Sequence, residues 1–161
     1  MASKASYNKP ASAFIKEVEN GKFSIVISDL ALNEFAKTVK NTLVKNGYTN
    51  PESWTKKIHE CMDRIFKLSG NVTIIPWHIT AKDDINYPFL QVSSSAYNLM
   101  LKYSGHTIQN RSGQNMHKGL STADTLHVAL ARMLKCSMIV TSDKDFEEVE
   151  EIPCKRPEDL I

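Results

Sequence analysis

The spacing of hydrophobic positions changes along the chain between two periods, which indicates helices and strands in turn. In several segments apolar residues recur at helical spacing, and most of these segments open with a capping residue or a proline. Short runs of β-branched and apolar residues, bounded by turn residues, lie between them and are typical of buried strands. Strands that alternate with helices in this way predict an α/β fold with a mostly parallel sheet.

In the first half of the chain, Pro10 is expected to open a short helix, because proline suits the first helical position. Ile15, Phe35 and Phe66 each belong to an apolar face at helical spacing, and the face with Phe66 is a possible dimer contact if it is exposed. The expected elements are a helix over residues 11–18, a buried strand over 23–28, a helix over 29–45, a helix over 51–69 and a strand over 72–77.

The second half contains the segment with the clearest pattern, which begins at Ser121 and ends at Phe146. It predicts a helix with Asp124 in its first turn, then a short strand, and then an acidic segment over residues 141–145, called the acidic exit of the strand. Residues 105–119 are polar and are expected to form a long loop, of the kind that is usually functional or mobile. The other expected elements are a helix over 91–103 and strands over 138–140 and 152–155.

Length and composition predict one soluble domain over residues 1–161, because 161 residues with 42% hydrophobic and 24% charged residues are ordinary for a globular protein. A net charge of +2 permits a polyanionic partner without demanding one. No apolar run approaches the ~20 residues of a membrane span, and the N-terminus has no signal-peptide pattern. Cys61, Cys136 and Cys154 are odd in number and widely spaced, so they are expected to be free thiols in a reducing cytoplasm.

Carboxylates follow the expected strands at three places. Glu34 lies early in the helix after the first strand, Asp124 lies early in the helix after the polar loop, and Asp143 and Asp145 follow the strand over 138–140. Ligands of parallel sheets bind where strands end and helices begin. Convergent carboxylates repel one another unless a hard cation such as magnesium joins them, and such an ion can activate water. These acids are therefore candidate metal ligands of a hydrolase.

Each acid also has an ordinary interpretation, which spacing alone leaves open. Asp124 suits the helix dipole in a first turn. Asp143 and Asp145 suit a turn, and Glu34 suits the solvated face of its helix. Their joint position at one sheet edge is what favours a shared site.

Three strings resemble the PIN domain, a family that includes the VapC-type toxin ribonucleases of bacteria and archaea. They are ISDLALNEF (residues 27–35), ADTLHVALA (residues 123–131) and IVTSDKDF (residues 139–146). Their order, spacing and local structure agree with the family from about Lys9 to the C-terminus. The resemblance implies a three-layer α/β/α sandwich and an endoribonuclease dependent on Mg²⁺ or Mn²⁺.

Carried over by motif, the resemblance implies that Asp124 and Asp143 ligate the metal and that Asp145 is a weaker fourth acid. Glu34 would ligate the metal or orient the attacking water. Two hydroxyl residues, Thr141 and Ser142, would support the carboxylates or the scissile phosphate.

The family opens with a central strand ending in an aspartate, and nothing in MASKASYNKP supplies either. Met1 would then be an internal methionine of a longer protein, or the chain would be a member that has lost its first ligand. The resemblance implies RNA, an antitoxin protein and a second copy of the chain as partners. Arg111 and Lys118 in the polar loop are candidate contacts to an RNA backbone, and a merely solvated loop is the alternative. The alternative is a catalytically impaired PIN-like module that binds RNA or a protein. A nucleotide-binding α/β domain is a more distant rival, since no Gly-rich phosphate loop is present.

Overall fold

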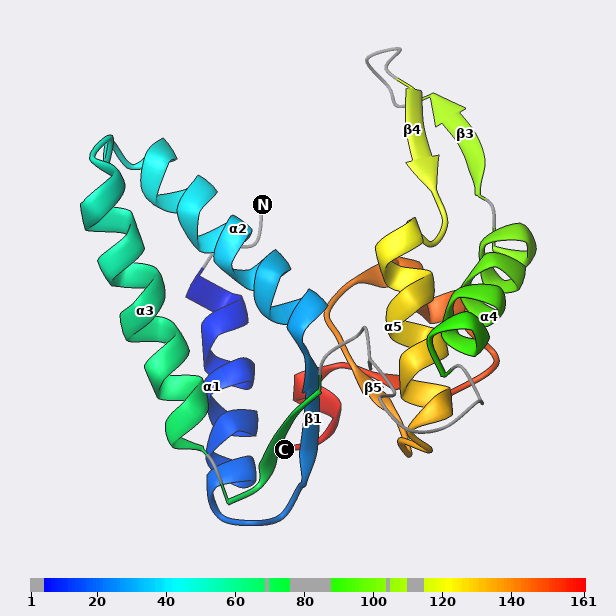
Figure 1. The fold of residues 1–161 in the computed structure, drawn as a ribbon, viewed down its shortest axis with the longest axis horizontal. Helices are drawn as coiled ribbons and strands as arrows, with labels where there is room; N and C mark the ends of the chain where they lie inside the picture. The colour runs from blue at the N-terminus through cyan, green and yellow to red at the C-terminus, as the bar shows by residue number, and fades with distance from the viewer. Residues whose placement is uncertain (1–4, 69, 76–87, 104, 110–114) are drawn as a thin grey trace. The chain divides into compact units, whose positions relative to one another are not determined.

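The computed structural model describes residues 5–68, 70–75, 88–103, 105–109 and 115–161 (Figure 1). The chain divides into two compact units, Met1–Trp77 and His78–Ile161, and each is described here by itself. Within the described residues, no helix is long and apolar enough to cross a membrane.

The first unit is built on a parallel pair of strands, β1 (Ile25–Ser28) and β2 (Val72–Ile75). The pairing runs in register from Ile25 opposite Val72 to Ser28 opposite Ile75. Two helices, α2 (Asp29–Lys45) and α3 (Pro51–Lys67), form the connection between these strands, and α1 (Ala5–Glu19) precedes them. A helical crossover between parallel strands is what the alternating pattern predicts.

Capping residues begin the two crossover helices at the predicted positions. The Ser28 hydroxyl accepts a hydrogen bond from the N–H of Ala31 at 3.1 Å, and the Asn50 side chain accepts one from the N–H of Glu52 at 2.9 Å. Pro51 occupies the first turn of α3, where its missing N–H has no intrahelical partner to lose.

Asn71 joins the end of α1 to the start of β1. Its side-chain amide donates to the Val18 carbonyl at 2.9 Å, and its own carbonyl accepts from the N–H of Ile25 at 2.8 Å. Val18 is fully buried, and Phe14 packs with its ring centroid 5.4 Å from that of Phe23. These contacts fix α1 beside the strand pair.

Several expectations for this unit were wrong. The first helix is already formed from Ala5, so Pro10 lies inside it rather than at its start. Val26 of β1 is 42% exposed, and its register partner Thr73 in β2 is exposed too, so the strand predicted to be buried is covered only in part. Ile15, Phe35 and Phe66 are exposed too, so the stripes they belong to are covered only in part. Pro76 and Trp77, expected to extend the second strand, lie outside the described residues.

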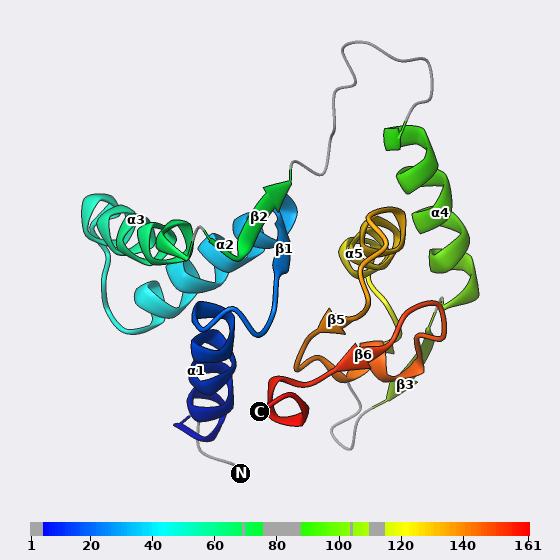
Figure 2. The same ribbon diagram turned by 90° about the horizontal axis from the view of Figure 1, so that it is seen from below.

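The second unit has its core between α4 (Pro88–Lys102) and α5 (Thr122–Met133). Buried residues of the two helices pack with Phe146 and Ile152 from the C-terminal segment, and they include Val92, Ala96, Leu99, Val128, Ala129 and Leu130. The short strands β5 (Ile139–Val140) and β6 (Cys154–Lys155) pair in parallel and lie side by side (Figure 2). Two 3₁₀ helices, η1 (Lys144–Glu148) and η2 (Pro157–Asp159), complete the unit.

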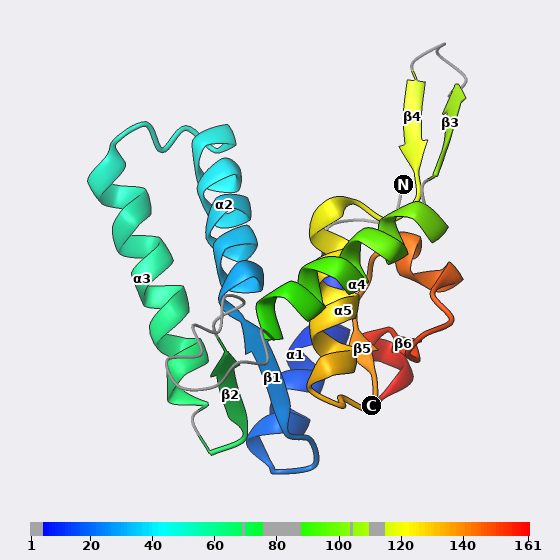
Figure 3. The same ribbon diagram turned by 45° about the vertical axis from the view of Figure 1, so that its right-hand side comes forward.

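The predicted polar loop over 105–119 is wrong, because it contains an antiparallel hairpin of β3 (His106–Gln109) and β4 (Asn115–Lys118). The register pairs His106 with Lys118 and Gln109 with Asn115. The hairpin stands out beyond the helices of its unit (Figures 1 and 3). The strands could not be predicted from the polar sequence, because β3 and β4 pair through their backbones and this pairing requires no alternation of apolar residues.

Candidate active site

Asp124 occupies the third position of α5 and belongs to a reciprocal cap. Its Oδ2 accepts a hydrogen bond from the N–H of Ser121 at 2.8 Å, and the Ser121 hydroxyl accepts one from the N–H of Asp124 at 3.2 Å. Two donors at the helix start are thereby satisfied. No hydrogen bond from the described residues reaches the second carboxylate oxygen, Oδ1, which therefore retains its capacity to bind a cation.

Asp143 caps η1 directly after β5. Its Oδ1 accepts from the N–H of Asp145 at 3.0 Å, and its own N–H donates to the Thr141 hydroxyl at 3.1 Å. The N–H of Thr141 in turn donates to the Lys155 carbonyl of β6 at 2.9 Å. The backbone of this acidic exit is thus tied to the parallel strand pair, while Asp143 and Ser142 remain exposed.

Asp124 and the Asp143 segment lie towards the same end of the second unit. β5 runs back along α5, so the residues that follow β5 lie towards the end at which α5 begins (Figures 1 and 3). This is the arrangement expected when a helix is followed by a strand of the same sheet. Phe146 of η1 is only 5% exposed and packs in the core, which anchors this short helix. On the exposed side of η1, Glu147 forms an ion pair with Arg156.

Glu34 belongs to the first unit, where it is an exposed residue of α2. Its membership of a cluster with Asp124 and Asp143 therefore stays a prediction. His127, one turn beyond Asp124, is half-buried. Of the expected RNA contacts, Lys118 is the last residue of β4 and Arg111 lies outside the described residues.

Sequence reasoning named Thr141 as a support for the acids but missed Ser121 as the partner of Asp124. The Ser121–Asp124 cap has a sequence signal, a serine followed three residues later by an acid. Thr125, beside Asp124, is fully buried and satisfies its hydroxyl by donating to the Thr122 carbonyl at 2.9 Å. Lys102 and the Tyr103 hydroxyl both donate hydrogen bonds to the Glu151 carboxylate, an arrangement called here the Glu151 clamp. It has no sequence signal, because its members are almost fifty residues apart.

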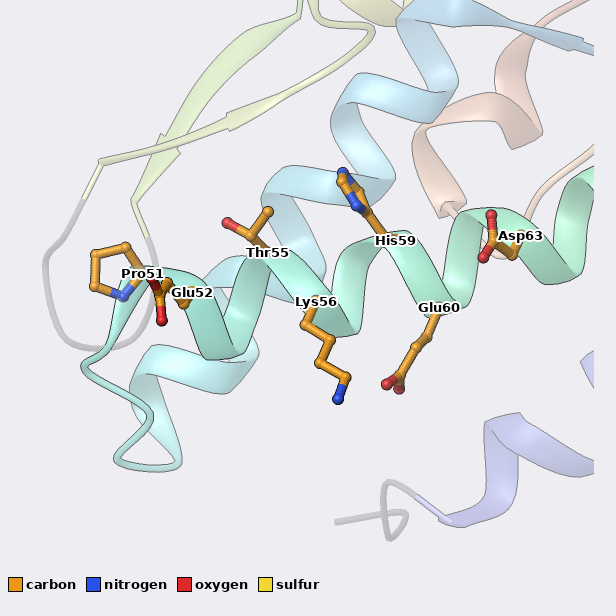
Figure 4. Close-up of a pocket in the computed structure, with 7 residues that line it drawn as sticks. All are labelled: Pro51, Glu52, Thr55, Lys56, His59, Glu60 and Asp63. Carbon is orange, nitrogen blue, oxygen red and sulfur yellow. The ribbon is translucent and has the colours of Figure 1, made fainter.

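Within the described residues, no group of three or more His, Cys, Asp or Glu side chains is assembled so as to hold a metal ion. The shallow hollow along α3, between Pro51 and Asp63, contains none of the predicted site residues (Figure 4). Its lining side chains stand in a row on one helix, and Glu60 among them is already paired with Lys57 at 2.7 Å. This surface is therefore not the candidate active site.

Helices connect the parallel strands of the first unit, as in an α/β protein, and the second unit has aspartates at a strand end and at a helix start. A family model described as the PIN domain matches residues 3–152. The match spans most of the chain, so the protein belongs to the PIN domain family. Proteins of this family are nucleases that act on RNA or DNA and generally depend on divalent metal ions. None of the curated proteins matches the chain significantly.

Proposed function

We propose that this PIN domain protein is a metal-dependent endoribonuclease of the VapC toxin type. The observation that carries the proposal is the state of two carboxylates. Asp124 and Asp143 each accept one backbone N–H through a single oxygen, in segments that lie towards the same end of the second unit. In each case no hydrogen bond from the described residues occupies the second oxygen.

The donor set fits a hard divalent cation. Mg²⁺ and Mn²⁺ prefer carboxylate oxygens, and Mg²⁺ retains several waters, so two aspartates suffice as protein ligands. Backbone N–H groups that hold the other oxygen of each aspartate fix its orientation, as hydrogen bonds to metal ligands usually do. When bound, the ion would activate water and stabilise charge on the phosphodiester.

Other residues of the chain would then position and support this pair. Asp145 lies two residues beyond Asp143 and would act as a weaker fourth acid. Glu34 would ligate the ion or orient the attacking water. Thr141 keeps the Asp143 backbone in place through its hydroxyl, and Ser142 is exposed and would hydrogen-bond the carboxylates or the scissile phosphate.

The competing function is a PIN-like module that binds RNA or a protein without cleaving it. The capping bonds favour it, because they account for Asp124 and Asp143 as structural residues without a metal. The two functions differ in what the aspartates do for the reaction, so they can be separated by substitution.

The test is cleavage of labelled single-stranded RNA with Mn²⁺ or Mg²⁺ by the parent protein and by the variants Asp124→Asn and Asp143→Asn. Asparagine keeps an oxygen that can accept the capping bond and removes the charge. Asp63→Asn, at an exposed position of α3, is the matched control. The proposal expects cleavage that stops in both site variants and persists in the control. Cleavage unchanged in the site variants contradicts it, and RNA binding without any cleavage favours the module.

An antitoxin partner and a homodimer belong to the same proposal through the VapC likeness. Phe66 on α3 is 49% exposed, whereas Trp54 is half-buried beneath the Lys40 ammonium, 4.8 Å from its ring centroid. Light scattering on the parent and on Phe66→Ser measures the mass directly. A dimer that becomes monomeric in the variant supports this face, and a monomeric parent contradicts the dimer.

The free cysteines agree with a reducing compartment such as the cytoplasm.

A further inference from the structure

Tyr103, the residue that follows α4, bonds to the segment that follows η1. Its hydroxyl donates to Glu151 Oε2 at 2.6 Å and accepts from the N–H of Glu150 at 3.1 Å. Lys102 donates to the other carboxylate oxygen, Glu151 Oε1, at 2.8 Å. The Glu151 side chain is only 13% exposed, so these charge-assisted bonds are partly shielded from water and hold better than ordinary surface contacts. The Glu151 clamp therefore fixes residues 150 and 151 to the end of α4.

A short run of hydrogen bonds connects the clamp to Asp143. The N–H of Val149, directly before the clamp, donates to the Phe146 carbonyl at 3.2 Å. At the other end of η1, the N–H of Asp145 donates to Asp143 Oδ1 at 3.0 Å. Phe146 is buried in the core and holds η1 at its middle. A segment held at one point can still rotate about it, and the clamp supplies a second point.

The main chain of Tyr103 also lies against the segment that leads into α5. Gly119 has a φ of +139°, and a Cβ added to it would lie 2.6 Å from the Tyr103 carbonyl oxygen and 2.6 Å from the Gly105 Cα. The two backbones are thus in contact at the base of the β3–β4 hairpin, and Gly119 lies two residues before Ser121, the N-cap that bonds to Asp124. Tyr103 therefore contacts, through different atoms, both of the segments that contain the candidate acids.

We propose that Tyr103 is a positioning residue for the candidate metal site, because it holds the segments of Asp124 and Asp143 in place relative to one another. The inference rests on the proposed function for the metal ion, whereas the position of the acids can be measured without one. When the hydroxyl is removed, the Asp143 segment keeps its anchor at Phe146 and the bond from the Thr141 N–H to β6. The expected result is therefore a weaker metal site and not an absent one.

The first measurement is the Mn²⁺ affinity of the folded protein, by isothermal titration. Tyr103→Phe removes the hydroxyl, keeps the ring and should raise the Kd for Mn²⁺ severalfold. This increase should largely disappear when Tyr103→Phe is combined with Asp143→Asn, because a residue that acts through Asp143 then has no carboxylate left to position. Val92→Ala is the matched control, since it removes buried methyl groups near the start of α4 and also lowers stability. It should leave the Kd unchanged.

The second measurement requires no metal. Amide hydrogen exchange, followed by NMR with EDTA present, reports on the bonds that orient the two carboxylates. In Tyr103→Phe the N–H of Asp145 should exchange severalfold faster, whereas that of Ser121 should change less, because the main-chain carbonyl of residue 103 remains. The N–H of Glu52, which donates to the Asn50 cap in the first unit, is the internal control and should not change.

Unchanged exchange at Asp145 overturns the proposal, and so does an equal rise in Kd in Tyr103→Phe and Val92→Ala. An undiminished effect of Tyr103→Phe in the Asp143→Asn background overturns it too. A parent and a Tyr103→Phe variant that bind Mn²⁺ with the same Kd uphold the metal site and contradict the positioning role. A parent that binds no Mn²⁺ contradicts the proposed function, and the exchange at Asp145 then decides the role of Tyr103. If Tyr103→Phe does not fold, Glu151→Gln, which weakens the same bonds, takes its place in both measurements.

Discussion

Ser121 and Asp124 cap α5 reciprocally, each accepting the backbone N–H of the other, at 2.8 Å to the Asp124 carboxylate and 3.2 Å to the Ser121 hydroxyl. The same carboxylate is therefore both a structural group and the best candidate for a metal ligand. The cap uses Oδ2, and the proposed metal role would use Oδ1, so the two can be separated experimentally by changing one partner at a time.

Ser121→Ala should lower the free energy of unfolding by about 1 kcal/mol, because it removes one cap acceptor and leaves the Asp124 carboxylate in place. Cleavage per folded molecule should change only severalfold. Asp124→Asn should change stability less and slow cleavage by about 100-fold or more, the scale on which one preorganised electrostatic group acts. Urea unfolding and RNA cleavage, measured on both variants, check this. Equal loss of cleavage in the two variants would show that Asp124 acts only as a cap.

Gly119→Ala should lower the free energy of unfolding by about 3 kcal/mol, since a φ of +139° is strained for any residue with a Cβ and the added carbon would meet Gly105 and Tyr103 backbone atoms at 2.6 Å. Gly70→Ala is the matched control, because nothing lies within 4 Å of its Cβ position and its φ is ordinary. It should change stability by less than about 0.5 kcal/mol. Thermal or urea unfolding of the two variants measures the difference, and equal stabilities would contradict a fixed hairpin base.

Mn²⁺ binding should depend on Asp124 and Asp143, with a smaller contribution from Asp145. Isothermal titration should show an affinity for Mn²⁺ that is about 10-fold lower, or lower still, in Asp143→Asn. The fold should not change, because the asparagine oxygen can still accept the capping bond from the Asp145 N–H. Asp145→Asn should weaken binding less. A parent protein with no measurable Mn²⁺ binding would contradict the metal site itself, whatever the variants do.

Local sequence signals predicted the helices better than the strands. Ser28, Asn50 and Ser121 each announce a helix through a side chain that accepts a backbone N–H, and the structure begins α2, α3 and α5 at these positions. Caps are decided within four residues, so sequence alone suffices. The β3–β4 pairing joins residues across a turn and has no apolar period, which is why the stretch was predicted as a loop.

The candidate site was predictable only in part, for a related reason. The position of Asp124 at a helix start and of Asp143 at a strand end follows from local pattern, and topology brings these ends together. Of the bonds that orient them, the Ser121–Asp124 cap has a local sequence signal, but the bond that the Thr141 hydroxyl accepts from the Asp143 N–H has none, and only the family resemblance points to Thr141. Long-range contacts such as that of Tyr103 with Glu151 arise when the chain packs, so no spacing of residues in the sequence indicates them.

Removing the Tyr103 hydroxyl should loosen the segment after η1. This hydroxyl donates to Glu151 Oε2 at 2.6 Å and accepts from the N–H of Glu150 at 3.1 Å, while Lys102 donates to Glu151 Oε1 at 2.8 Å. Tyr103→Phe should lower the free energy of unfolding by about 2 kcal/mol, the usual loss when a hydrogen bond to a charged group is removed. Hydrogen exchange at residues 147–151 should be faster in the variant, and unchanged exchange would contradict the clamp.

The stability contributed by this clamp should fall in acid. Burial disfavours the ionised form of Glu151, but hydrogen bonds from Lys102 and Tyr103 outweigh it and hold the pKa of this carboxyl below its usual range. A group whose pKa is lower in the folded protein than in the unfolded chain stabilises the fold above the unfolded value, about 4.3 for glutamate, and loses that contribution as the pH falls through the folded pKa. The same bonds raise the pKa of Lys102, so its contribution is lost only in strong alkali.

Urea unfolding of the parent should therefore show stability decreasing below about pH 4, and Tyr103→Phe should show a shallower decrease because the pKa of its Glu151 is closer to the usual value. Glu158→Gln, at an exposed position of η2, should follow the parent curve. Parallel curves for the parent and Tyr103→Phe between about pH 5 and pH 3 would show that the Tyr103 hydroxyl does not lower the pKa of Glu151.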